Sequence, residues 1–347
     1  PSSPPAEEEE AAATTTSKEP ASSPATGSAS PSASAPASAS ASAGPSAAPT
    51  RLVVGLGYIP SVQFAQFYLA DQRGYYAAAG LEVELQNKID PDLVTLVGQG
   101  AIDIGEADGT SVIPAVSQGI PVRYAATVYG TNPTVVIAKA GSGIASAADL
   151  KGKRIGIPGQ YGASWIMLQA LLASAGLTPA DVTIVPYPDY GQATALQQGV
   201  VDAATGYANN EPIALEEAGV PVVVLGTPDA TRLPGPGLIV STATLAAKEA
   251  ALKAFVAATM RAQTEIAADP EVGLQAAFAA VPELAKDPDT QRKILASTIE
   301  MWKDPAGGAY GALDRAGWSA SIAFMSGLGL VPSPVTADDL LTETLLP

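Results

Sequence analysis

The chain has 347 residues, a formal net charge of −16, and neither cysteine nor histidine. Without cysteine, disulfides and thiolate chemistry are excluded, and without histidine the commonest general base and metal ligand is missing, so we expect no catalytic residue, metal or cofactor. The acidic charge also excludes a nucleic-acid phosphate backbone as a natural partner.

Residues 1–50 contain no valine, isoleucine, leucine, methionine or aromatic residue. Such a segment cannot bury enough apolar surface to offset the entropy of ordering, so we expect a disordered tether. No apolar run is long enough to span a membrane, and no signal peptide is present. An export tether fits a bacterial lipoprotein, and we expect a lipid-bearing cysteine just upstream of residue 1.

From Arg51 onward, short β-branched runs alternate with longer stretches rich in alanine and leucine. This alternation is typical of βα units around largely parallel sheets, which predicts an α/β fold. We expect ten strands, at residues 52–56, 81–85, 102–105, 122–128, 135–138, 154–157, 182–185, 203–205, 222–225 and 238–241. Four helices should follow, near residues 246–268, 271–280, 287–302 and 314–328.

An internal repeat of roughly 100 residues runs through the strand region. Three matches recur in the same order: residues 78–81 with 174–177, residues 97–103 with 196–202, and residues 119–122 with 219–222. In the first match, each glycine stands where a helix would end in a left-handed cap. The repeat predicts two similar α/β lobes.

The C-terminal helices are expected to pack back on the first lobe. Lobe 1 would then comprise residues 51–131 and 239–347, and lobe 2 residues 132–238. The chain would cross between the lobes near Asn132 and Gly237, and such crossings act as hinges.

Ligands of open α/β sheets bind beyond the carboxyl ends of the strands. Four loops at such ends are rich in aromatic and hydrogen-bonding side chains, at residues 57–64, 106–110, 159–165 and 206–211. The candidate ligand-binding residues in them are Tyr58, Gln63, Phe64, Asp108, Tyr161, Trp165, Tyr207, Asn209, Asn210 and Glu211. The rings of Tyr58, Tyr161, Trp165 and Tyr207 could instead pack between loop and lobe. Phe64 could belong to the core, and Asp108 could cap a helix.

None of the four loops contains lysine or arginine. An anionic ligand usually meets an arginine fork or a lysine, so the loops predict a neutral, flat, aromatic ligand stacked on the rings. A helix N-terminus can bind an anion without a basic side chain, which leaves that alternative open. Arg123, Lys139 and Arg232 could lie near the cleft, but we expect each to be solvated. Asp103 and Asp202, at repeated positions, are expected to serve the fold.

Several segments resemble one known family. They are Gly57-Tyr58-Ile59-Pro60 and residues 67–70, 74–83, 149–156 and 199–203. On these segments, residues 52–328 resemble the NMT1/THI5-like branch of ABC-transporter solute-binding proteins. The resemblance implies a type II periplasmic-binding-protein fold, a cleft between two lobes that close on the ligand, and delivery to an ABC permease.

Within this branch, Gly57-Tyr58-Ile59-Pro60 followed by Val62-Gln63-Phe64 looks most like the riboflavin-binding proteins of RibXY-type importers. The resemblance implies an extracytoplasmic monomer that binds riboflavin as transported ligand. A thiamine pyrimidine precursor, another small organic solute such as a sulfonate, and a ligand-sensing surface protein stay as alternatives. Enzymes that resemble this family rely on histidine and cysteine, which this chain lacks.

Overall fold

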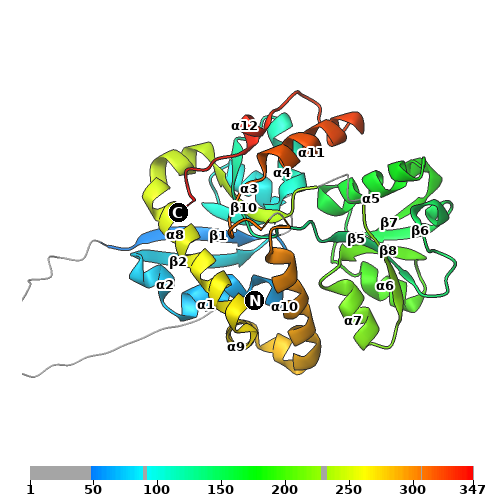
Figure 1. The fold of residues 1–347 in the computed structure, drawn as a ribbon, viewed down its shortest axis with the longest axis horizontal. Coiled ribbons are helices and arrows are strands. Elements are labelled where there is room, and N and C mark those ends of the chain that lie inside the picture. Colours follow the sequence, from blue (N-terminus) through cyan, green and yellow to red (C-terminus); the bar gives the residue numbers. More distant parts are fainter. Residues whose placement is uncertain (1–47, 89–91, 228–232, 306, 347) are drawn as a thin grey trace, which may run out of the picture. The chain divides into compact units, whose positions relative to one another are not determined.

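The computed structural model describes residues 48–88, 92–227, 233–305 and 307–346 (Figure 1). Most of the predicted tether, residues 1–47, lies outside this part, and the first strand begins at Thr50. Residues from Ala47 onward form one compact unit by their contacts, so the lobe boundaries at 131/132 and 238/239 stay a prediction.

Two five-stranded sheets organise the described residues. The first contains, in order, β2 (Leu81–Asn87), β1 (Thr50–Leu56), β3 (Ile104–Asp108), β10 (Pro236–Ser241) and β4 (Val122–Thr127). The second contains β7 (Thr183–Pro186), β6 (Arg154–Ile157), β8 (Ala203–Tyr207), β5 (Thr134–Lys139) and β9 (Val222–Leu225). We call the first sheet with its helices lobe 1 and the second lobe 2. All ten expected strands are confirmed, as is the α/β class.

The sheets are mixed, whereas the sequence predicted largely parallel ones. β10 runs antiparallel to β3 and β4, and β5 runs antiparallel to β8 and β9. Each of these two strands enters its sheet directly after the chain has crossed from the other lobe. Only six residues separate β4 from β5 and ten separate β9 from β10, fewer than the dozen or so that a crossover to a parallel neighbour requires.

The internal repeat is confirmed by the two strand orders. β2-β1-β3-β10-β4 matches β7-β6-β8-β5-β9 position by position, so each lobe supplies the same arrangement. Gly80 and Gly176, which end the matched helices before β2 and β7, have φ of 72° and 71°. Only glycine adopts this left-handed conformation freely, which explains the repeated glycines.

Asp103 and Asp202 hold equivalent places in the two lobes. Asp103 accepts a hydrogen bond from the Val53 backbone N–H at 2.9 Å, and Asp202 accepts one from that of Arg154 at 2.8 Å. Each also forms an ion pair, Asp103 with Lys248 at 2.8 Å and Asp202 with Arg154 at 2.9 Å. Asp103, directly before β3, is thus tied to β1, and Asp202, directly before β8, is tied to β6, which is the role in the fold expected of them.

Helices cover both sheets. In lobe 1 they are η1 (Val62–Phe64), α1 (Ala65–Gln72), α2 (Tyr75–Ala78), α3 (Asp92–Gly98), α4 (Gly109–Ser117), α8 (Thr242–Ala268), α9 (Pro270–Ala280), η5 (Pro282–Lys286), α10 (Pro288–Trp302), α11 (Arg315–Gly327) and α12 (Ala337–Leu340). In lobe 2 they are η2 (Ala147–Leu150), α5 (Gly162–Ser174), η3 (Pro179–Asp181), α6 (Gln192–Gln198) and α7 (Glu211–Glu217). The expected C-terminal helices are confirmed, and α8 and α9 pack on α1 of lobe 1.

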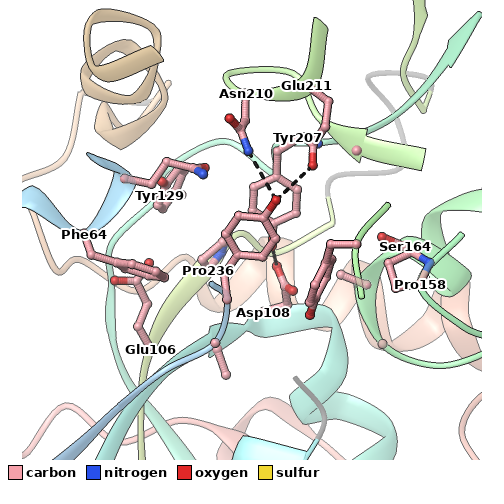
Figure 2. A pocket seen from close by; sticks show the side chains of 18 of the residues that line it. Phe64, Glu106, Asp108, Tyr129, Pro158, Ser164, Tyr207, Asn210, Glu211 and Pro236 are labelled. Atoms are coloured by element: carbon pink, nitrogen blue, oxygen red, sulfur yellow. Dashed lines mark hydrogen bonds between the residues drawn. The ribbon is translucent and has the colours of Figure 1, made fainter. Parts of the chain in front are cut away.

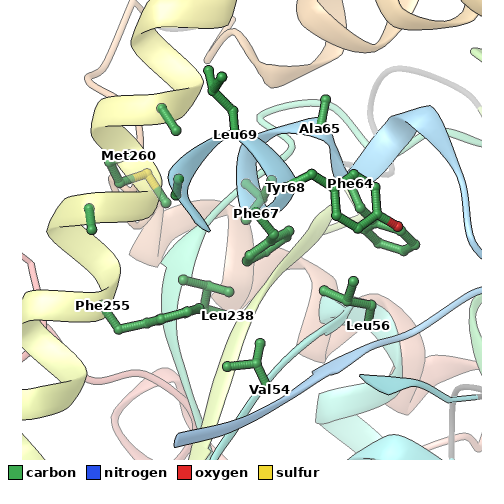
Figure 3. Packing of buried hydrophobic residues seen from close by; sticks show 14 of the residues in the cluster. Val54, Leu56, Phe64, Ala65, Phe67, Tyr68, Leu69, Leu238, Phe255 and Met260 are labelled. Carbon is green, nitrogen blue, oxygen red and sulfur yellow. The ribbon is translucent and has the colours of Figure 1, made fainter. Parts of the chain in front are cut away.

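The largest core cluster of lobe 1 lies between the sheet and helices α1, α8 and α9 (Figure 3). The ring of Phe255 stacks on that of Tyr76 at 5.0 Å and on that of Phe67 at 6.2 Å between centroids. Phe64, at the start of this helix run, joins the same cluster and is 5% exposed. The core cluster therefore holds in place the segment that follows β1, which contains Phe64.

The two crossings lie next to each other. Asn132 on the first donates its side-chain N–H to the Pro234 carbonyl oxygen on the second, at 2.9 Å. Tyr124 donates its hydroxyl to the Gly235 carbonyl oxygen at 3.1 Å. The hinge position expected near Asn132 and Gly237 thus coincides with paired, hydrogen-bonded segments.

Candidate ligand-binding site

A cavity opens between the lobes, where β1 and β3 end in lobe 1 and β6 and β8 end in lobe 2 (Figure 2). Its empty space, including open solvent at the mouth, is about 770 Å³. The lining residues are Gly57, Tyr58, Gln63, Phe64, Glu106, Ala107, Asp108, Tyr129, Pro158, Tyr161, Gly162, Ala163, Ser164, Tyr190, Gln192, Gly206, Tyr207, Asn210, Glu211 and Pro236.

The structure brings most of the predicted site residues to this one cavity. Tyr58, Gln63, Phe64, Asp108, Tyr161, Tyr207, Asn210 and Glu211 all line it. Trp165 does not, because on α5 it packs partly buried against the second hydrophobic cluster. Asn209 also lies behind the lining, and its side chain is fully buried. The binding role of all ten residues stays a prediction.

Two tyrosine–carboxylate pairs join the lobes across the cavity. Tyr58 of lobe 1 donates its hydroxyl to Glu211 Oε1 of lobe 2 at 3.3 Å. Tyr207 of lobe 2 donates its hydroxyl to the Asp108 carboxylate of lobe 1 (Figure 2). Asp108 precedes α4, but its side chain makes no cap hydrogen bond there. The alternative of a helix-capping role is therefore not what the structure shows.

Asn209 forms a third bridge. Its side-chain N–H groups donate to Gln63 Oε1 at 3.0 Å and to Thr298 Oγ1 on α10 at 2.7 Å. Gln63 faces the cavity, whereas Asn209 holds it from the opposite lobe. Asn209 therefore sets the position of a lining side chain.

Tyr190 is a lining residue that sequence reasoning missed. It follows β7, and its ring meets that of Tyr58 edge-on, with centroids 4.8 Å apart and an interplanar angle of 81°. Its φ is 60°, the only positive value of a non-glycine residue in the described part of the chain. Non-glycine residues in this region are strained, and such strain gathers at binding sites. The available signal was a tyrosine in a loop after a strand, as in the four loops that were selected.

Three carboxyl groups line the cavity, and all are buried. Burial raises the pKa of Glu106 to about 8, helped by the negative charge of Asp108, while a hydrogen bond from Gln66 opposes the shift. Burial also raises the pKa of Asp108, to about 6, and that of Glu211. Glu106 was not singled out by sequence reasoning, although its spacing from Asp108 puts both on one face of β3.

No lysine or arginine is among the lining residues. Arg123 donates to the Asp338 carbonyl oxygen, and Lys139 donates to that of Gln197 at 2.8 Å. Arg232 lies outside the described residues. Within the described part of the chain, no group of acidic side chains is arranged to hold a metal ion. No helix there has the length and apolarity needed to cross a membrane.

The two lobes, paired crossings and intervening cavity define a periplasmic-binding-protein type of fold. The alkanesulfonate-binding protein SsuA from Xanthomonas axonopodis pv. citri, bound to MOPS, superposes with a TM-score of 0.69. The match covers 85% of this chain and 99% of that one at 19% identity, which shows a shared fold.

The family model NMT1/THI5 like matches residues 61–272. Over 303 residues, covering 86% of each chain, the sequence is 33% identical to the riboflavin-binding protein RibY of Chloroflexus aurantiacus. The chain belongs to the NMT1/THI5-like family. A second relative, the 4-amino-5-hydroxymethyl-2-methylpyrimidine phosphate synthase of Schizosaccharomyces pombe, is 33% identical over 150 residues, 43% of this chain and 42% of that protein.

Proposed function

We propose that this protein binds riboflavin between its lobes, as the solute-binding protein of an ABC importer. The observation that carries the proposal is the cavity itself, lined by rings from both lobes and free of basic side chains among the described residues. The riboflavin-binding relative RibY, matched over most of both chains, supports the same ligand.

The rings suit a large flat ligand. Tyr161 is the most open of them, with 38% of its surface exposed, and it stands at the start of α5 on lobe 2. Tyr58 and Phe64 come from lobe 1, so a three-ring isoalloxazine would lie between rings of opposite lobes. Stacking of this kind is worth about 1–3 kcal/mol per ring contact.

The polar side chains suit the edges of the same ligand. Glu211 and Asp108 can accept hydrogen bonds from a ring N–H or from ribityl hydroxyl groups. A protonated Glu106, with its pKa near 8, can donate to a ring carbonyl or nitrogen. Gln63, fixed by Asn209, offers an amide for either purpose.

A pair of alanine variants on α5 tests the site. Tyr161→Ala removes an exposed ring that faces the cavity, and we expect riboflavin affinity to fall about 5- to 150-fold. Trp165→Ala, one helical turn away, removes a ring outside the lining, and we expect little change in affinity. The measurement is quenching of flavin fluorescence on titration, with melting curves to show that both variants fold. A large loss in Trp165→Ala and none in Tyr161→Ala would contradict this placement.

The remaining parts of the proposal concern the protein's surroundings. We propose an extracytoplasmic protein that releases its ligand to a permease and performs no chemistry on it, since the chain has neither histidine nor cysteine. The lipid anchor upstream of residue 1 and the monomeric state stay predictions.

A thiamine pyrimidine precursor is the second candidate. The three carboxyl groups of the cavity could pair with the amino and ring N–H groups of an aminopyrimidine, and synthases of such a compound match part of the chain. Calorimetry with the pyrimidine, run beside the riboflavin titration, decides between the two. Binding heat with the pyrimidine, together with no quenching of flavin fluorescence, would assign the pyrimidine precursor as the ligand instead of riboflavin.

A further inference from the structure

We infer that the cavity selects its ligand by charge, accepting riboflavin in its uncharged form and rejecting its 5′-phosphate. This inference rests on the proposed function and adds a selectivity to it. Its basis is the set of acidic groups around the cavity and the way each of them is partnered.

In the contacts that the structure shows, every acidic group of the cavity accepts hydrogen bonds from uncharged donors only. Asp108 accepts from the Tyr207 hydroxyl, Glu211 from the Tyr58 hydroxyl and the Tyr207 backbone N–H, and Glu106 from the Gln66 amide at 3.2 Å. None of the ion pairs between described residues involves these three groups. A phosphate brought here would meet the uncompensated negative charge of Asp108 and Glu211 at low dielectric constant, where repulsion is strong.

Helix N-termini are the other possible source of positive potential. Asp108 stands directly before α4 and makes no side-chain cap hydrogen bond, so its carboxyl group adds negative charge beside that helix end without capping it. α7 is short, and its first residue, Glu211, places a carboxylate at that helix start. The start of α5, at Gly162, and that of α6, at Gln192, line the cavity with no carboxylate in the first turn. Two helix ends together contribute about one positive charge, less than the negative charge that two carboxylates, Asp108 and Glu211, bring.

The same carboxyl groups serve an uncharged ligand well. Carboxylates accept hydrogen bonds strongly, and a ligand rich in N–H and O–H groups can supply them where the tyrosine hydroxyls now do. The tyrosines would then be free to stack or to turn toward other ligand atoms. The groups that repel a phosphate thus recognise the uncharged form.

The experiment compares riboflavin and flavin mononucleotide in fluorescence titrations of the full chain at neutral pH. For the unmodified protein we expect the mononucleotide to bind at least about tenfold more weakly. Asp108→Asn and Glu211→Gln keep the hydrogen-bond acceptor and remove the charge, so each should lower the ratio of the two dissociation constants by roughly threefold or more. Glu283→Gln is the control, because it removes an exposed carboxylate outside the cavity.

Each outcome has a distinct meaning. Equal binding of both flavins by the unmodified protein would overturn the inference and leave the proposed function standing. A ratio that Asp108→Asn and Glu211→Gln leave unchanged, in variants that melt normally, would also overturn it. If neither flavin binds, the proposed function fails, and the inference fails with it.

Discussion

Glu106 is 4% exposed on a central strand, next to Asp108. Its pKa rises from 4.5 in the unfolded chain to about 8 in the folded protein, chiefly because burial disfavours the charged form. Between these values the folded protein keeps a proton that the unfolded chain has released. The folded state then binds more protons, so the free energy of unfolding falls as the pH rises.

The first prediction concerns this pH window. The stability that the folded protein gains from keeping Glu106 protonated should be fully present below about pH 4.5 and lost as the pH rises through about 8. At about 1.4 kcal/mol per pKa unit, the free energy of unfolding should fall by a few kcal/mol over this range. Denaturant unfolding at pH 5 and pH 8.5 measures it. Glu106→Gln should lose most of the difference between the two pH values, whereas the exposed Glu283→Gln should keep it. An undiminished difference in Glu106→Gln would contradict the assignment.

The second prediction concerns the strained backbone of Tyr190. Asparagine tolerates positive φ better than tyrosine does, so Tyr190→Asn should unfold no more easily than the unmodified protein and could gain up to about 1 kcal/mol. It should still bind riboflavin about tenfold more weakly, because the ring beside Tyr58 is lost. Tyr190→Phe keeps ring and strain and serves as the control. Unfolding and fluorescence titrations check both, and unchanged affinity in Tyr190→Asn would show that the ring makes no contribution.

At the scale of elements, the start of β10 in lobe 1 is tightly packed against β4. A Cβ atom on Gly237 would lie 2.1 Å from the Tyr124 hydroxyl oxygen and 2.4 Å from the Ala126 carbonyl oxygen. Gly226, after β9, has no such neighbours within 4 Å. The hinge-side end of the strand therefore has no room for a side chain.

The third prediction follows from this contrast. Gly237→Ala should destabilise the protein by about 1–3 kcal/mol or more, because overpacking forces the backbone or neighbouring side chains to move. Gly226→Ala should change the free energy of unfolding by no more than about half a kcal/mol. Thermal melting of both variants compares them directly, and equal melting temperatures would be inconsistent with the tight packing.

The elements were predictable where their signal is local. Strands such as β6 and β9 follow from short apolar runs, and the matched glycines follow from the repeat. The antiparallel direction of β5 and β10 did not follow, because it depends on where the chain crosses between lobes. α8 begins at Thr242 instead of the expected Ala246, because the Ser241 side chain accepts from the Thr244 N–H at 3.0 Å.

The site was partly predictable for the same reason. Strand ends identified the loops that carry Tyr58, Asp108 and Tyr207. Packing was an open alternative for Trp165, and its ring does pack on the second hydrophobic cluster. A loop position after a strand does not distinguish such packing from ligand contact, because tertiary contacts decide between them. Tyr190 depends on a left-handed backbone, which tertiary contacts impose.

At the scale of the whole molecule, ligand bound between the lobes should stabilise both. Riboflavin at about 100 times its dissociation constant should add about 2.7 kcal/mol to the free energy of unfolding, if the unfolded chain does not bind it. Scanning calorimetry with increasing riboflavin measures the shift. A single transition that moves to higher temperature is expected, and two transitions of which one stays fixed would show that the ligand touches one lobe alone.

The placement of β10 also sets an order of assembly. Among the described strands, β4 pairs with β10 and with no other, so residues 122–127 have no sheet partner until residues 236–241 have been synthesised. All strands of lobe 2 lie within residues 134–225, and its sheet can close earlier. In a nascent chain, the sheet of lobe 2 would therefore be complete before that of lobe 1. Until residues 236–241 are synthesised, β3 and β4 of lobe 1 would lack the strand that lies between them. Hydrogen exchange on ribosome-bound nascent chains should accordingly find amides of β5 and β8 protected at shorter chain lengths than those of β4.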